Sequence, residues 1–233
     1  MNESQKRLRK MLLTASLVTM GIVLDLVISA IPGLNLGMPF GGKFFGISMF
    51  PLVLIGLICG LSYGIIGGLL FAVYNFSADY LITLATINEL IELFTDSGFT
   101  FGQWMLIIFF DYLIPFTGFG LSGLFSKSFQ HISVVFKAII VTSAVRLISS
   151  TLSGVLIWGD SIEWLKNNPE EMEHPLTNFI VNIYNFFGGN IWLYSFTYNL
   201  IYILTSGILV SFIFWQTHQR IYSKSQELVF NQA

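Results

Sequence analysis

Three ionisable residues lie inside long apolar stretches of the sequence and are the first candidates for chemistry. They are Asp25, Asp111 and Arg146. A charged side chain at membrane depth is costly unless it is paired or faces water, so each is by default a candidate for a functional site. The alternative is an Asp–Arg ion pair that only holds helices together, and the sequence leaves both interpretations open.

Asp111 stands in a distinctive local context. It is followed directly by Tyr112 and, one helical turn later, by Pro115. Proline has no backbone N–H and therefore leaves a helix carbonyl free, which is tolerated at membrane depth next to a cavity. A carboxylate at such a place can accept hydrogen bonds from an amine or balance a cationic ring. We therefore expect Asp111 and Tyr112 to face a bound small molecule.

Polar aromatic residues open the last apolar stretch. Tyr194, Tyr198 and Tyr202 recur at a spacing of four and share one helical face. Asn199 lies beside them, and its amide offers both a donor and an acceptor with which to read the edge of a heterocycle. Trp158 ends the preceding apolar stretch and could stack on a flat ring or contact a cation. An aromatic belt at the membrane surface is the alternative for these residues.

Motifs of catalysis are missing from the sequence. It contains no phosphate-binding loop, no HExxH and no GxSxG. Ser149 and Ser150 have no histidine within an apolar stretch to activate them, because the three histidines lie outside these stretches and are expected to be solvated: His131, His174 and His218. The pattern favours binding of a small polar molecule, without cofactor or metal. An intramembrane enzyme or an assembly protein is the alternative.

The composition indicates where these residues are embedded. Of the 233 residues, 54% are hydrophobic and only 10% are charged, whereas about a quarter of the residues of a soluble domain are charged. The 23 Phe, 9 Tyr and 5 Trp suit lipid-facing helices and membrane interfaces. A net charge of -2 without a basic stripe argues against a nucleic-acid partner. The single cysteine, Cys59, excludes an internal disulfide.

Six apolar stretches predict an all-α integral membrane protein, a six-helix bundle that forms one membrane domain over residues 1–233. The second and third helices are short and are separated only by a turn at Gly60. The first is longer than the apolar core of a signal peptide, so we expect it to be retained. The helices are expected at residues 10–31, 44–59, 61–75, 103–125, 134–158 and 190–215.

Two longer polar loops, residues 77–102 and 159–189, lie between these helices, and each could hold a short surface helix. Their acidic residues are Asp79, Glu89, Glu92, Asp96, Asp160, Glu163, Glu170, Glu171 and Glu173. Most basic residues fall on the opposite side of the predicted membrane: Lys6, Arg7, Arg9, Lys10, Lys127, Lys137, Arg220 and Lys224. Since basic segments stay in the cytoplasm, both termini are expected to be cytoplasmic and the two longer loops extracellular.

Small residues recur at helical spacing in two places. Such residues permit close contact between helices. In the first helix, Ala15 and Thr19 form a weak pair of this kind. The stronger pattern is in the second and third helices, although its second member is expected in the turn between them: Gly56, Gly60, Gly64 and Gly68.

In their order and spacing, four stretches resemble the substrate-binding S components of energy-coupling-factor (ECF) vitamin transporters, and specifically the thiamine-specific branch. The resemblance runs over most of the predicted helical core, residues 8–216. The stretches are the glycine-rich turn at residues 60–68, the Asp-Tyr segment at 111–125, the helix at 146–158 and the start of the last helix at 194–199.

The resemblance implies a thiamine pocket lined by Asp111, Tyr112, Trp158, Tyr194 and Asn199. Asp111 replaces the family's Glu, and Ser150 stands where the family has His. Ser150 and Arg146 complete the expected substrate-binding set. The altered positions leave open a thiamine precursor or another vitamin as the ligand.

The resemblance also implies partners. An S component has no ATPase of its own, captures its vitamin outside the cell, and docks within the lipid of the cell membrane on a transmembrane T component that carries two cytoplasmic ATPase subunits. The family's docking face consists of small residues on the first helix, for which Ala15, Thr19 and Gly21 are the candidates. The lack of a nucleotide-binding motif agrees with this division of labour.

Overall fold

The computed structural model describes residues 2–34, 36–82, 84, 98–168 and 174–230. Within these ranges the chain is mainly helical and has no β-strand, apart from an isolated antiparallel bridge between Gly37 and Lys43. The predicted all-α fold is therefore confirmed. The acidic residues expected in the two long loops are only partly covered, and six lie outside the described residues: Glu89, Glu92, Asp96, Glu170, Glu171 and Glu173.

Five helical spans in the described part of the chain are long and apolar enough to cross a membrane. They are Glu3–Ala30, Leu61–Leu81, Phe101–Ser128, Ile132–Leu156 and Ile191–Val229. The sixth apolar helix, Met49–Cys59, has only 11 residues, or about 16 Å at 1.5 Å per residue. An integral membrane protein is confirmed, and the expected six spans consist of five long helices and one that is too short to cross a bilayer alone.

Helix α1 (Glu3–Ala30) begins seven residues before the predicted start at residue 10. Its start is fixed by a capping box, in which the Asn2 side chain accepts from the Gln5 N–H and Gln5 bonds back to Asn2. The helix ends before Pro32, because the residue that precedes a proline disfavours the helical conformation. The polar residues before residue 10 are therefore helical and form the first turns of α1.

Helix α2 (Met49–Cys59) is buried along its whole length and forms the centre of the bundle. Its predicted start at residue 44 is wrong by five residues, because Ser206 bonds the backbone of this segment and holds it in turns. Gly60 makes the turn to α3 (Leu61–Phe76) with a φ of 98°, a conformation that favours glycine. The π-helical turn η1 (Ser77–Leu81) continues α3.

The span at residues 101–128 is continuous but changes its winding. It consists of α5 (Phe101–Ile107), the π-helical η2 (Ile108–Leu113), α6 (Ile114–Thr117) and the 3-10 helix η3 (Gly118–Ser128). Its N-terminus has a capping box between Thr100 and Gln103. A π-helical turn inside a helix often marks a functional site, and here it carries Asp111 and Tyr112.

The second half of the chain contains two long helices with two short ones between them. These are α7 (Ile132–Leu156), α8 (Gly159–Asn167), α9 (Thr177–Phe186) and α10 (Ile191–Ser225), which ends in the π-helical η5 (Gln226–Phe230). Because α10 runs ten residues beyond the predicted end, the expectation that His218 is solvated is wrong. Its Nε2 lies 2.7 Å from the Phe129 carbonyl oxygen and is buried.

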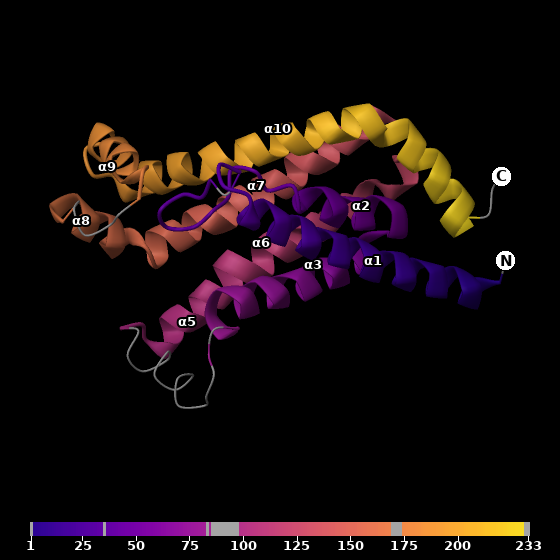
Figure 1. Cartoon of the computed structure of the whole chain (residues 1–233), viewed down its shortest axis with the longest axis horizontal. Coiled ribbons are helices and arrows are strands. Elements are labelled where there is room, and N and C mark those ends of the chain that lie inside the picture. Colours follow the sequence, from indigo (N-terminus) through magenta and orange to yellow (C-terminus); the bar gives the residue numbers. More distant parts are fainter. Residues whose placement is uncertain (1, 35, 83, 85–97, 169–173, 231–233) are drawn as a thin grey trace.

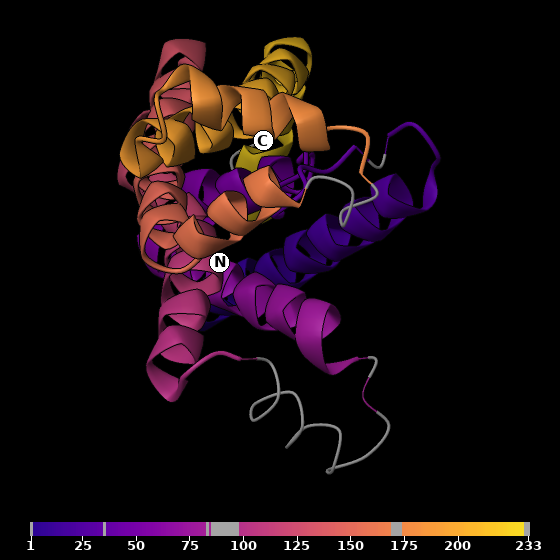
Figure 2. The same cartoon turned by 90° about the vertical axis from the view of Figure 1, so that its left-hand side faces the viewer.

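Both termini lie at one end of the bundle, and α8 and α9 lie at the other (Figure 1). Helix α10 packs along α7, and its last turns bend toward the start of α1, where the Arg9 Nη1 donates to the Leu228 carbonyl oxygen over 2.8 Å. Seen from the end opposite the termini, α8 and α9 are the elements nearest the viewer, with the bundle behind them (Figure 2). Cytoplasmic termini stay a prediction.

Glycines close the half of the bundle that contains the turn between α2 and α3. A Cβ on Gly64 would lie 2.8 Å from the Cα of Gly120, and one on Gly68 would lie 2.8 Å from the Cα of Thr117. In the same region the Ser122 hydroxyl donates to the Val53 carbonyl oxygen over 2.8 Å. The glycine repeat therefore serves contacts within the chain, between α2, α3, α6 and η3.

Candidate ligand-binding site

A cavity of about 520 Å³ lies among the helices, a volume in the range of small-molecule sites. Side chains of α1, α3, η1, η2, α7 and α10 line it, together with the segment between α1 and α2. The structure brings all the predicted substrate-binding residues to this one cavity: Asp111, Tyr112, Arg146, Ser150, Trp158, Tyr194 and Asn199. Their contact with a ligand stays a prediction.

The π-helical turn η2 positions the acidic side of the cavity. The Ile114 N–H bonds to the Phe109 carbonyl oxygen, five residues back, so in this winding Pro115 is the residue that should donate to Phe110. Proline has no N–H, and the Ser149 hydroxyl of α7 takes its place, donating to the Phe110 oxygen over 2.7 Å. Pro115 thus leaves a backbone carbonyl free, as expected, and a side chain of the neighbouring helix α7 bonds it.

Asp111 has a hydrogen-bond partner, but among the described residues it forms no ion pair with a basic side chain. Its Oδ2 accepts from the Trp158 indole Nε1 over 3.2 Å. Within the described chain no ion pair involves Asp111. Trp158 follows the end of α7, and its ring meets Phe99 edge-on at 5.6 Å. The indole therefore fixes the carboxylate without neutralising it.

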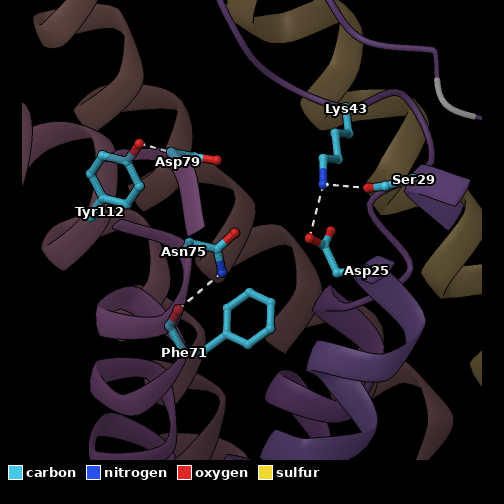
Figure 3. Close-up of polar contacts among 7 residues, drawn as sticks. All are labelled: Asp25, Ser29, Lys43, Phe71, Asn75, Asp79 and Tyr112. Carbon is cyan, nitrogen blue, oxygen red and sulfur yellow. Dashed lines mark hydrogen bonds and ion pairs between the residues drawn. The ribbon is translucent and has the colours of Figure 1, made fainter. Parts of the chain in front are cut away.

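Asp79 is a second carboxylate on the same side. It lies on η1, and its Oδ2 accepts from the Tyr112 hydroxyl over 2.7 Å (Figure 3). The predicted pocket residue Tyr112 thus points its hydroxyl at an acidic residue that was expected only in the polar loop. The missed signal is that no glycine or proline interrupts the chain between Gly68 and Gly98, so the helix could continue to Asp79.

A third carboxylate, Asp25 of α1, has a basic partner. Lys43 Nζ lies 2.8 Å from Asp25 Oδ2 and donates to the Ser29 hydroxyl over 3.0 Å (Figure 3). Asp25 therefore pairs with Lys43 from the segment after α1, and the alternative of an Asp–Arg pair does not describe it. Asn75, whose side chain bonds the Phe71 carbonyl oxygen, lies between this pair and Asp79 (Figure 3).

Arg146 lies between aromatic rings. Its guanidinium carbon is 5.4 Å from the centre of the Tyr202 ring and 5.9 Å from that of Phe119. Such contacts stabilise a cation through the ring face. No ion pair in the described part of the chain involves Arg146, so its charge stays available to the cavity that it lines.

The tyrosines of α10 differ in what their hydroxyls contact. Tyr198 donates to the Gly41 carbonyl oxygen over 3.0 Å and accepts from the Phe40 N–H over 2.8 Å. Tyr202 donates to the Asn199 Oδ1 over 2.7 Å. Tyr194 is only 5% exposed, and its hydroxyl has no hydrogen-bond partner among the described residues. Since buried polar groups are normally bonded, this hydroxyl is free to bond an atom of a bound molecule, and that role stays a prediction.

Asn199 uses its amide within the protein. Its Nδ2 donates to the carbonyl oxygens of Ser195 over 2.8 Å and of Ser150 over 3.1 Å. Its Oδ1 accepts from Tyr202. The amide therefore joins α10 to α7 and orients Tyr202, and we infer that Asn199 shapes the cavity more than it reads a ligand edge.

The segment between α1 and α2 closes one side of the cavity. Residues 39–43 line the cavity. Gly42, with a φ of 95°, packs against the Tyr202 ring so closely that a Cβ would lie 2.6 Å from it. Tyr198 and Ser206 bond the backbone of the same segment. Glycine is therefore required where this segment crosses α10.

The polar stretch at residues 159–189 contains the two short helices α8 and α9 and supports the tyrosine face from outside. Tyr184 meets Tyr194 edge-on at 5.5 Å and donates to the Glu163 carboxylate over 2.9 Å. Burial, followed by this bond and the negative charge of Glu163, raises the pKa of Tyr184. None of the described residues of this stretch lines the cavity. Trp158, which does line it, stands directly before α8.

The expected docking residues of α1 do not share one face. Ala15 and Thr19 are exposed. Gly21 is buried, and a Cβ there would lie 3.3 Å from the Phe71 ring and 3.5 Å from Pro51. A partner therefore cannot use Gly21 together with Ala15 and Thr19, because α1 turns Gly21 toward the core.

The fold and the cavity together define a class of protein: a helical membrane protein with an internal cavity large enough for a small molecule. Residues 85–187 match the model of the family described as thiamine transporter protein. The chain is 26% identical to the thiamine transporter ThiT of Bacillus subtilis over an alignment of 223 residues, and the match covers 91% of each protein.

A solved structure of ThiT from Listeria monocytogenes has the same fold, with a TM-score of 0.62. The two chains are 19% identical, and the match covers 96% of this chain and 98% of that one. The family model and the Bacillus subtilis relative confirm the resemblance to thiamine transporters that was inferred from the sequence. With the five apolar spans, they also confirm the expected multi-pass protein of the cell membrane.

Proposed function

We propose that the chain is a membrane substrate-binding subunit that captures thiamine for ATP-driven uptake. The observation that carries the proposal is the charge of the cavity. Three carboxylates line it, those of Asp25, Asp79 and Asp111, against two basic groups, those of Lys43 and Arg146. One net negative charge remains, and thiamine carries one positive charge on its thiazolium ring.

The lining also matches the other parts of thiamine. Trp158 provides an aromatic face for a flat ring, and its bond to Asp111 places a carboxylate beside that ring. The Tyr194 hydroxyl, which has no partner among the described residues, can bond the edge of the aminopyrimidine. Arg146 can donate to a ring nitrogen or a hydroxyl oxygen. A charge-assisted contact of this kind in a desolvated site is stronger than a neutral one.

A relative of thiamine is the second candidate ligand, and Ser150 favours it. Ser150 lines the cavity where the resembling family has His. A smaller side chain at this position leaves room for a bulkier substituent on the ligand. The capture role and the fold are the same for both ligands.

The proposed partners are a transmembrane T component and two ATPase subunits, since the chain has no nucleotide-binding motif. Ala15 and Thr19 are exposed small residues on α1, where another helix can approach closely. Gly21 is excluded from this surface by its burial. This chain would then bind the vitamin, and its partners would supply the energy.

Titration calorimetry of the purified chain with thiamine tests the proposal directly. We expect saturable binding of one thiamine per chain and a rise of the melting temperature with thiamine concentration, because a ligand of the folded state stabilises it. A pyrimidine precursor and riboflavin serve as competitors. Mass spectrometry of small molecules that copurify with the protein provides an independent reading. No heat and no stabilisation with thiamine would contradict the proposal.

A further inference from the structure

The three carboxylates of the cavity are not equivalent. Asp25 forms an ion pair with Lys43 at 2.8 Å and is neutralised by it. Asp79 faces this pair from η1, and among the described residues it is held only by the neutral Tyr112 hydroxyl, at 2.7 Å (Figure 3). A phenol donor fixes the direction of a carboxylate but leaves its charge intact.

No basic side chain is available to neutralise Asp79. No ion pair among the described residues involves it. The rest of the chain, residues 1, 35, 83, 85–97, 169–173 and 231–233, contains no Lys, Arg or His. The charge of Asp79 is therefore directed at the solvent and at the cavity.

Position separates Asp79 from Asp111. Asp79 is exposed although it lines the cavity, whereas Asp111 is partly buried. Asp79 therefore stands at the rim, where it meets whatever part of a ligand is nearest the solvent. The Tyr194 hydroxyl, buried and unpartnered within the described chain, lines the same cavity and is free to bond a polar atom of a ligand.

We propose that Asp79, positioned by Tyr112, is a specificity-determining carboxylate that selects the free cationic vitamin against its phosphate esters. The inference rests on the proposed function. A phosphate on thiamine is linked through only two carbons to the cationic ring, so a carboxylate that attracts the ring at the rim also meets the phosphate. Specificity is a difference of affinities, and repulsion of the wrong ligand contributes to it.

Titration of the purified full-length chain with thiamine and with thiamine monophosphate tests this role. In Asp79→Asn we expect the dissociation constant for thiamine to rise about tenfold, equivalent to ~1.4 kcal/mol. Binding of the monophosphate should be unchanged or tighter, so that the preference for thiamine falls by at least about tenfold. Asp79→Glu retains the charge and should retain most of the preference.

Two further variants separate selection from structural damage. Tyr112→Phe leaves Asp79 in place but frees its orientation, so the preference should fall by about threefold, as for the loss of one hydrogen bond. Asp160→Asn makes the same chemical change at an exposed position of α8 outside the cavity, and should leave the preference unchanged.

An unchanged preference in Asp79→Asn, in a protein that still binds thiamine, would overturn the inference and leave the proposed function standing. A wild-type chain that does not bind thiamine would overturn both, and the wild-type titration shows this before any variant is made. A preference that falls equally in Asp160→Asn would also overturn it, because the effect would then come from overall charge.

Discussion

The two halves of the helix bundle are built on opposite principles. Around the turn between α2 and α3, glycines bring backbones into direct contact, and a Cβ on Gly64 would lie 2.8 Å from Gly120. At the other end, the same helices diverge around a cavity of about 520 Å³. There the contacts are made by aromatic rings and by hydrogen bonds of side chains to backbone, as for Ser149 and Tyr198.

This difference between the two halves explains how a short chain can be rigid and still contain a cavity. Apolar attraction does not hold helices together in lipid, so close packing of small residues must do so. The half around the turn between α2 and α3, here called the glycine half, provides that packing. The π-helical turns η1 and η2 change the helix winding where the other half, the cavity half, begins. Stability and binding should therefore be separable, with glycine variants affecting the first and cavity variants the second.

The largest effect is expected from Gly120→Ala. The added Cβ would overlap the backbone of Gly64 and Ile65 on α3, which cannot move like a side chain. Overpacking of this kind typically costs 1–3 kcal/mol, and we expect about 3 kcal/mol of unfolding free energy here. Thermal unfolding in detergent measures the loss. Gly102→Ala is the control, since a Cβ there meets only the Thr100 hydroxyl at 3.9 Å.

The comparison predicts that the folded fraction of Gly120→Ala binds thiamine with wild-type affinity. An equal loss of stability in Gly102→Ala would show that helical glycines matter in general and that the glycine half has no special role. A changed thiamine affinity in the folded fraction would show that packing in one half shapes the other.

Asp111→Asn is the converse experiment, in the cavity half. The amide is nearly the same size and can still accept from the Trp158 N–H, so the fold should be retained. Loss of the negative charge should weaken thiamine binding about tenfold or more, on the order of 1.4 kcal/mol. Calorimetric titration measures it, with Asp160→Asn as the charge-matched control. Wild-type affinity would remove Asp111 from the site.

The sequence predicted these two halves unequally. Apolar stretches identified the long helices, and the cost of charge at membrane depth singled out Asp111 and Arg146. Trp158 was singled out as the aromatic ring that ends an apolar stretch. The glycine spacing indicated close contact, although not its partner η3. Both signals are local and depend on composition at fixed spacing, which a single sequence displays.

What the sequence did not predict depends on winding and on tertiary pairing. The third helix was expected to end at residue 75, so Asp79 was assigned to a loop, since a π-helical turn has no apolar signature. The Lys43–Asp25 pair joins residues 18 apart through a turn segment. The burial of His218 follows from the length of α10 and its contact with Phe129, neither of which hydrophobicity alone reveals.

Ser149→Ala tests the boundary between the halves. The variant removes the donor to the Phe110 carbonyl, which Pro115 cannot replace. We expect a loss of about 1 kcal/mol in unfolding free energy, as for one hydrogen bond. Because the bond also holds η2, thiamine affinity should fall about threefold with it. Ser143→Ala on the same helix is the control, since the Ser143 hydroxyl has no partner in the described chain.

A loss of stability in Ser149→Ala without any change in affinity would show that η2 keeps its winding unaided. A loss of equal size in Ser143→Ala would show that the effect belongs to α7 as a whole. Chemical denaturation and calorimetric titration on the same preparations distinguish these results.

Tyr194→Phe should have the smallest combined effect on stability and thiamine binding, and it should separate binding from stability most clearly. The Tyr194 hydroxyl has no partner among the described residues, so its removal costs the empty protein no hydrogen bond and relieves a buried polar group. Stability should be unchanged or slightly higher, while thiamine binding weakens about threefold. Tyr198→Phe is the matched contrast, because its hydroxyl bonds Phe40 and Gly41 and its loss should lower stability. If Tyr194→Phe lowered stability as much as Tyr198→Phe, the hydroxyl would have a structural partner, and the cavity half would not be built around a ligand at this point.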